Sequence, residues 1–112
     1  MIERDWLTKK LNPLLKKERP DICWFKLGDT FGGHKKPCDG IMVKDRETLF
    51  VEVKESNKSL TPNELLSAIK VASSGGLYYI LRYYPNKHIS WQKYGSDDID
   101  IFDDIDHFII WL

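Results

Sequence analysis

One segment in the middle of the chain constrains the fold most, because it predicts a strand, a helix and a second strand in succession. "TLFVEVKE" (48–55) and "LYYILRYY" (77–84) are rich in the branched and aromatic residues that favour strands. Between them, Thr61, Pro62 and Glu64 have the pattern of a capping box with proline in the first turn, which marks a helix start. A strand that follows a crossover helix usually lies parallel in the same sheet, so we expect a parallel strand pair here.

The helix of this segment has an apolar stripe made by Leu65, Ala68 or Ile69, and Ala72. "SSGG" (73–76) should end it, with Gly75 or Gly76 taking the left-handed cap position.

The residues before this segment predict a helix followed by strands. An amphipathic helix is indicated by apolar residues at spacings of three and four, namely Trp6, Leu7, Leu11, Leu14 and Leu15. Pro13 should kink this helix, or end it near Leu11 and let it restart with Asn12 as the cap. Segments 22–27, 38–44 and 48–55 predict a three-stranded meander with a tight turn at 45–47. The predicted fold is therefore α/β, an αβββαβ succession with a mixed central sheet flanked by helices.

The pattern after Pro85 leaves alternatives open. "HISWQKY" (88–94) and "HFIIWL" (107–112) predict an edge hairpin, or the second of them a short strand or helix that closes the core. We expect one domain in the 112 residues, with a core at about 1–84 and an extension at 85–112. The six aspartates between residues 97 and 106 are expected to form a solvated connection.

Composition and charge exclude several classes of protein. With 42% hydrophobic and 30% charged residues, the chain is neither disordered nor fibrous. No apolar run is long enough to cross a membrane and the charged N-terminus does not resemble a signal peptide, so we expect a cytoplasmic protein with no membrane partner and two free cysteines. The net charge is zero, but residues 1–60 carry 13 basic and 10 acidic residues, whereas residues 61–112 carry 4 basic and 7 acidic residues. Such a chain could present one basic face to a polyanion, or simply carry solvated charge.

Asp39, Glu52 and Lys54 are the residues that could do chemistry. Glu52 and Lys54 share one side of an otherwise apolar strand, and the hairpin places Asp39 near them, at the end away from its turn. Two converging carboxylates suit a hard divalent cation such as Mg²⁺ or Mn²⁺, and no organic cofactor is expected. A lysine beside them would orient a water molecule or meet a phosphate oxygen, which is what metal-assisted phosphodiester hydrolysis needs.

Asp39 and the "ExK" of Glu52 and Lys54 are followed by a capped helix and an apolar strand. This pattern resembles that of the PD-(D/E)XK nuclease superfamily, especially its small VRR-NUC and Holliday-junction-resolvase-like members. The resemblance covers roughly residues 1–84 and implies a restriction-endonuclease-like core. It implies that Asp39, Glu52 and the carbonyl of Val53 bind Mg²⁺ or Mn²⁺, and that Lys54 assists the attacking water. Two features depart from the family pattern: Cys38 separates Pro37 from Asp39, and Glu64 stands where VRR-NUC members tend to have glutamine.

The same resemblance points to a glutamate near the start of the first helix. Glu3 matches that place, and Glu18 is the alternative beyond Pro13. Glu64 is expected to cap its helix and to lie near the metal.

Several basic residues are candidates for DNA contact: Lys26 on the first predicted strand, and His34, Lys35 and Lys36 in a glycine-containing loop. Lys26 is equally compatible with an ordinary surface lysine.

The leading hypothesis is a metal-dependent deoxyribonuclease, with branched DNA or junctions as candidate substrates. We expect it to act as a homodimer because one small domain offers little surface to grip a duplex. Its size would suit a virus or a mobile element. The alternative is a catalytically silent module of the same fold that binds nucleic acid or a protein partner. A weaker hypothesis is a DNA mimic that uses the aspartates of 97–106.

Overall fold

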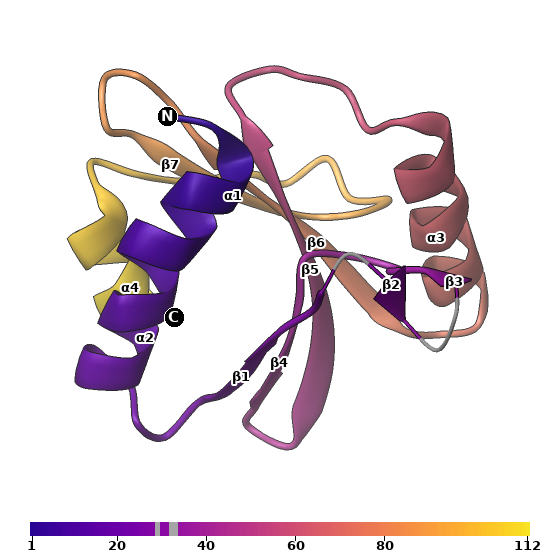
Figure 1. The fold of residues 1–112 in the computed structure, drawn as a ribbon, viewed down its shortest axis with the longest axis horizontal. Helices are drawn as coiled ribbons and strands as arrows, with labels where there is room; N and C mark the ends of the chain where they lie inside the picture. The colour runs from indigo at the N-terminus through magenta and orange to yellow at the C-terminus, as the bar shows by residue number, and fades with distance from the viewer. Residues whose placement is uncertain (29, 32–33) are drawn as a thin grey trace.

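The computed structural model describes residues 1–28, 30–31 and 34–112, and it describes only the backbone of residues 30, 31 and 34. Within these residues the centre is a six-stranded mixed sheet of order β1-β4-β5-β6-β7-β8 (Figure 1). Its strands are β1 (Cys23–Lys26), β4 (Gly40–Lys44), β5 (Glu47–Glu55), β6 (Leu77–Tyr83), β7 (Ile89–Lys93) and β8 (Asp100–Phe102). β5 and β6 pair parallel, as predicted, and the other neighbours pair antiparallel. The predicted mixed α/β fold is confirmed.

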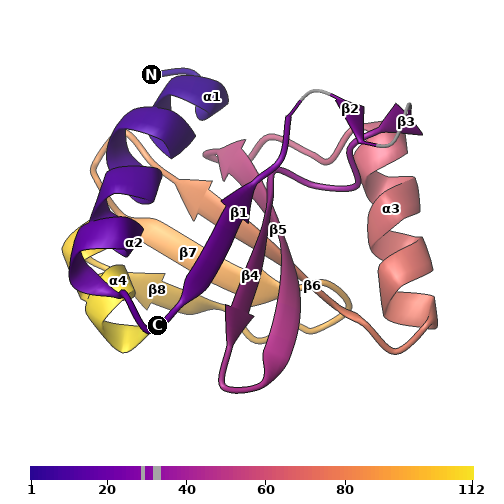
Figure 2. The same ribbon diagram turned by 60° about the horizontal axis from the view of Figure 1, so that its bottom comes forward.

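Helices lie on both faces of this sheet (Figure 2). On one face, α1 (Glu3–Trp6), the π-helical turn η1 (Leu7–Leu11) and α2 (Asn12–Glu18) follow one another, and α4 (Ile105–Trp111) packs beside α2. The other face carries α3 (Pro62–Ser73) and a separate ribbon of β2 (Thr30–Phe31) and β3 (His34–Lys35). Among the described residues, no helix has the length and apolar character needed to span a bilayer.

The first helix passes through Pro13 without a break. In η1 the N–H of Asn12 bonds to the carbonyl of Leu7, one residue further back than in an α-helix. This wider turn ends just before Pro13, which then occupies the first turn of α2, where a missing N–H does least harm. A π-turn therefore replaces the predicted kink or restart, and Asn12 makes no side-chain cap.

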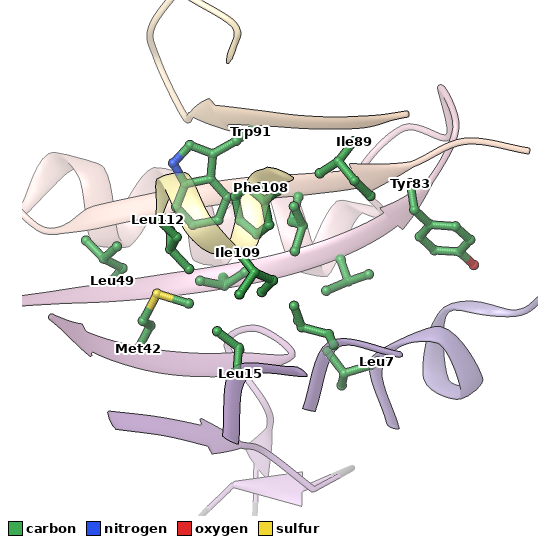
Figure 3. Packing of buried hydrophobic residues seen from close by; sticks show 14 of the residues in the cluster. Leu7, Leu15, Met42, Leu49, Tyr83, Ile89, Trp91, Phe108, Ile109 and Leu112 are labelled. Carbon is green, nitrogen blue, oxygen red and sulfur yellow. The ribbon is translucent and has the colours of Figure 1, made fainter. Parts of the chain in front are cut away.

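The main core lies between the sheet and the layer of α1, α2 and α4 (Figure 3). Leu7, Leu11 and Leu15 of the first helix and Phe108 and Ile109 of α4 are all buried there. A smaller cluster under α3 is formed by Cys38, Ala68, Tyr78 and Ile80. Because α3 buries little, this side of the sheet keeps room for polar groups.

The predicted apolar stripe of α3 turns out to face mostly outward. Thr61 and Glu64 form the predicted capping box and Gly75 has a φ of +83°, the left-handed conformation that favours glycine. However, Ala68 is buried, whereas Leu65 and Ile69 are exposed. A helix that meets the sheet through an alanine approaches it closely, so the larger side chains on either side of the contact remain in solvent.

The C-terminal residues belong to the same sheet and core. Ile89–Lys93 and Asp100–Phe102 are its last two strands, and residues 105–111 form the short helix that was one of the alternatives. The aspartate-rich stretch is not only a connection, because Asp100 lies in β8 and Asp104 caps α4 by accepting the N–H of His107 at 2.9 Å. The turn before β5 has Asp45 and Arg46 at positive φ, as a two-residue hairpin of the primed type requires.

Candidate active site

Asp39 lies just before β4 and is held against β5. Gly40 pairs with Val51, so Asp39 sits where the paired part of the hairpin ends. Its backbone N–H donates to the carbonyl of Val51 at 3.0 Å, and its Oδ2 accepts the N–H of Val53 at 2.8 Å. These two bonds fix the carboxylate beside the residue that separates Glu52 from Lys54.

Glu52 is buried next to two other carboxyl groups. It is 4% exposed and contacts the side chains of Asp39 and Glu64. Burial, and after it the negative charge of Asp39, raises the pKa of Glu52 from 4.5 to about 10. The hydroxyl of Tyr78 lies 3.5 Å from Glu52 Oε2 and 3.3 Å from the carbonyl oxygen of Pro37. At neutral pH this group of carboxyls therefore holds a proton.

Lys54 is buried and charged. Its Nζ lies 2.8 Å from Glu64 Oε1. Burial alone would lower the pKa of Lys54, but the hydrogen bond and charge of Glu64, with the charges of Glu3 and Glu52, raise it overall. The ammonium group is thus kept next to the carboxyls.

Glu64 links the start of α3 to this cluster. The oxygen that meets Lys54 also accepts the N–H of Thr61 at 2.8 Å. Burial would raise the pKa of Glu64, but the bonds from Lys54 and Thr61 lower it overall, so this carboxyl is ionised. One side chain therefore caps the helix and anchors the lysine.

Of the two candidate glutamates in the first helix, the structure brings Glu3 to the site. Glu3 Oε2 accepts the N–H of Glu55 at 3.1 Å, at the end of β5, and Glu3 lines the same cavity as Asp39 and Glu52. Glu18 lies at the far end of the helical segment, where it pairs with Lys17 on the surface at 3.9 Å.

The cluster opens into a cavity of about 400 Å³ that also contains cations. Arg4, Lys26 and Lys36 line it together with the acids. Lys36 Nζ donates to Asp39 Oδ1 at 2.9 Å, so part of the carboxylate charge is already balanced. Lys35 is exposed in β3, and the side chain of His34 lies outside the described residues.

The donor set fits a hard cation with few protein ligands. Asp39 and Glu52 supply carboxylate oxygens, and the strand geometry that points the N–H of Val53 towards Asp39 points its carbonyl to the same edge. Mg²⁺ is usually held by one or two carboxylates with water in the remaining positions. Among the described residues, no group of three or more acidic, histidine or cysteine side chains is already arranged to hold a metal ion. Here the oxygen of Glu64 faces Lys54 and Thr61 instead.

The sequence analysis did not find two of these contacts. Tyr78 reaches Glu52 because the parallel register places Ile80 beside Glu52, and Tyr78 shares the face of Ile80. The ion pair of Lys36 with Asp39 was not foreseen either, although a spacing of three residues in a loop makes such a contact feasible. The strand register, once known, would have identified Tyr78.

Comparisons with known proteins support the fold. No protein-family model matches the sequence, and the comparison with curated proteins finds no relative. Among solved structures, the chain resembles Hjc of Archaeoglobus fulgidus, a Holliday junction resolvase from an archaeal hyperthermophile, with a TM-score of 0.54 at 15% identity over 89% of each chain. Because 89% of the chain is covered, this likeness extends over more than the 84 residues of the expected core. The chain therefore shares its fold with this resolvase.

Proposed function

We propose that this protein is a metal-dependent endonuclease that hydrolyses DNA phosphodiester bonds. The observation that carries the proposal is a cavity lined by Asp39, Glu52 and Glu64, with Lys54 held beside these carboxyls by an ion pair of 2.8 Å to Glu64. A buried carboxyl cluster costs stability unless it serves a bound cation, and a buried lysine beside it has the charge to meet a phosphate.

In this proposal Asp39, Glu52 and the carbonyl of Val53 hold Mg²⁺ or Mn²⁺. When bound, the cation would lower the pKa of a water molecule and stabilise charge on the phosphate. Lys54 would orient the attacking water, and its bond to Glu64 would keep the ammonium in place. Glu3 would support the site by holding the end of β5 through the N–H of Glu55.

Cations around the cavity would bind the DNA backbone. Lys26 and Lys36 line the cavity itself, and Lys35 and His34 belong to the neighbouring ribbon. We also propose a preference for branched DNA, because the Archaeoglobus protein of similar fold is a Holliday junction resolvase.

A homodimer would let two such sites act on one branched substrate. Strand 77–84 is unsuitable as a dimer contact because β6 lies between β5 and β7. The exposed side chains of Leu65, Leu66 and Ile69 on α3 form a better surface. Two copies of a chain with zero net charge do not repel each other as a whole, and an isologous contact brings the same helix together twice.

The proposal is tested by single-turnover cleavage of a labelled four-way junction and a linear duplex of the same sequence in Mg²⁺ or Mn²⁺. Asp39→Asn and Lys54→Met should lose at least about 100-fold in rate, a typical loss when a positioned catalytic group is removed. Glu47 is an exposed residue on β5, the strand that carries Lys54, so Glu47→Gln serves as the matched control and should cut normally. Full activity of Asp39→Asn would refute the proposal, and junction binding without cleavage by the wild type would support the silent binding module.

A further inference from the structure

A second cavity runs from the candidate active site along the first strand. This basic groove, of about 480 Å³, lies between α2 and β1. Its helix wall is made by Asn12, Leu15, Lys16 and Arg19, which share one face of a helix at spacings of three and four. Its strand wall is made by Trp24 and Lys26, which share one face of β1, and by Ile22, the residue just before this strand. Lys26 lines both this groove and the active-site cavity, so the two are neighbours.

The groove is positively charged. Among the residues that line it, three are basic and none is acidic. Arg19 is partly neutralised, because its guanidinium donates to Asp21 at 2.8 and 3.0 Å. Lys16 and Lys26 form no ion pair among the described residues, so their charge remains available for a polyanion.

Trp24 lies in the groove and packs on the backbone of Gly40, the residue after Asp39. Its Nε1 donates to Asn12 Oδ1 at 2.6 Å, which fixes the indole between helix and strand. A Cβ added at Gly40 would lie 2.2 Å from the Trp24 ring, so the ring rests directly on the backbone next to Asp39. The half-buried ring offers an apolar surface at the point where the groove meets the site.

We propose that this groove binds one single strand of DNA that continues from the scissile phosphate. The inference rests on the proposed nuclease function and names its substrate more closely: a branched DNA with a single-stranded arm. A basic groove with an aromatic wall is how proteins commonly follow a single strand. β1 is also the outer strand of the sheet, so some of its backbone N–H groups point away from β4 and can meet phosphate oxygens.

Two neighbouring lysines provide the test. Lys16 lines the groove, whereas Lys17 is outside it, with its side chain 80% exposed beside Glu18. The affinities of wild type, Lys16→Glu and Lys17→Glu are measured in EDTA for fluorescein-labelled duplexes that are blunt or carry a 3′ or 5′ single-stranded tail. EDTA prevents cleavage, so the readout does not depend on activity.

Lys16→Glu should weaken binding of one tailed duplex about tenfold. The plot of log K against log salt should become less steep by about 0.7 or more, as expected for a lost phosphate contact on a single strand. Its binding to blunt duplex, and all binding by Lys17→Glu, should stay near wild type. Equal effects of the two substitutions, or equal losses of affinity for blunt and tailed DNA, would contradict the proposal that the groove binds a single strand. This binding titration tests the groove even if the wild type cannot cut DNA. If the wild type cuts DNA but Lys16→Glu and Lys17→Glu affect binding equally, the groove proposal is wrong and the nuclease proposal remains.

Discussion

Without bound metal, Glu52→Gln should be more stable than the wild type, and this difference should grow as the pH rises. Glutamine has the shape of a protonated glutamate, so it keeps the packing at Asp39 and Tyr78 but cannot ionise. The pKa of Glu52 is raised from 4.5 to about 10, so between these values the folded wild type binds a proton that the unfolded chain does not. Stability of the wild type therefore falls with increasing pH across that window, and the substitution removes this loss.

The magnitude follows from linkage. One proton of difference changes the free energy of unfolding by about 1.4 kcal/mol per pH unit, so the variant should gain roughly 3 kcal/mol over the wild type between pH 6 and pH 8. Side-chain relaxation on ionisation would reduce this figure. The assay is urea denaturation in EDTA at several pH values, with Glu47→Gln as the exposed control on the same strand.

A divalent cation should offset much of this loss of stability in the wild type. Binding at 100 times its dissociation constant stabilises a folded protein by about 2.7 kcal/mol. Millimolar Mn²⁺ should therefore raise the melting temperature of the wild type and leave Glu52→Gln nearly unchanged. Parallel pH profiles of the two proteins in EDTA, with the same response to Mn²⁺, would show that Glu52 is neither proton-bearing nor a ligand.

Three further predictions concern the support of the site and the C-terminal helix. Gly40→Ala places a Cβ 2.2 Å from the Trp24 ring and should cost about 1–3 kcal/mol in urea denaturation; a loss below a few tenths would contradict the packing. Thr61→Ala removes one half of the capping box and should cost about 1 kcal/mol, whereas Thr61→Ser should retain most of that stability. Asp104 raises the pKa of His107, so this pair should stabilise the fold below the ordinary histidine pKa and lose that effect as the pH rises through the raised value. An NMR titration of His107 should show the raised pKa in the wild type and its return in Asp104→Ala.

The parallel strand pair, the capped helix and the hairpin could be predicted because each is encoded by local chemistry. Thr61 and Glu64 satisfy backbone groups within one turn, and alternation in 48–55 identifies a strand before any partner is known. The approach of Asp39 to β5 follows from the same hairpin.

The sequence could not show which side of α3 faces the sheet or that β8 joins the sheet, and it left open whether 107–112 forms a strand or a helix. Leu65 and Ile69 form a helical stripe with Ala68, and the stripe alone does not say that only the alanine is buried. The π-turn before Pro13 and the contact of Tyr78 with Glu52 depend on packing between segments far apart in the chain. The groove beside Trp24 likewise arises only when α2 is placed against β1.

The most direct test of the nuclease proposal is cleavage of a labelled panel of duplex, single-stranded, flap and four-way-junction DNA by the wild type and Glu52→Gln, with Mg²⁺, with Mn²⁺ and with EDTA. We predict cutting of branched substrates by the wild type in either metal, and none in EDTA or by the variant. Cutting that persists in EDTA or in Glu52→Gln, or a wild type that binds the junction and cuts nothing, would contradict the proposal.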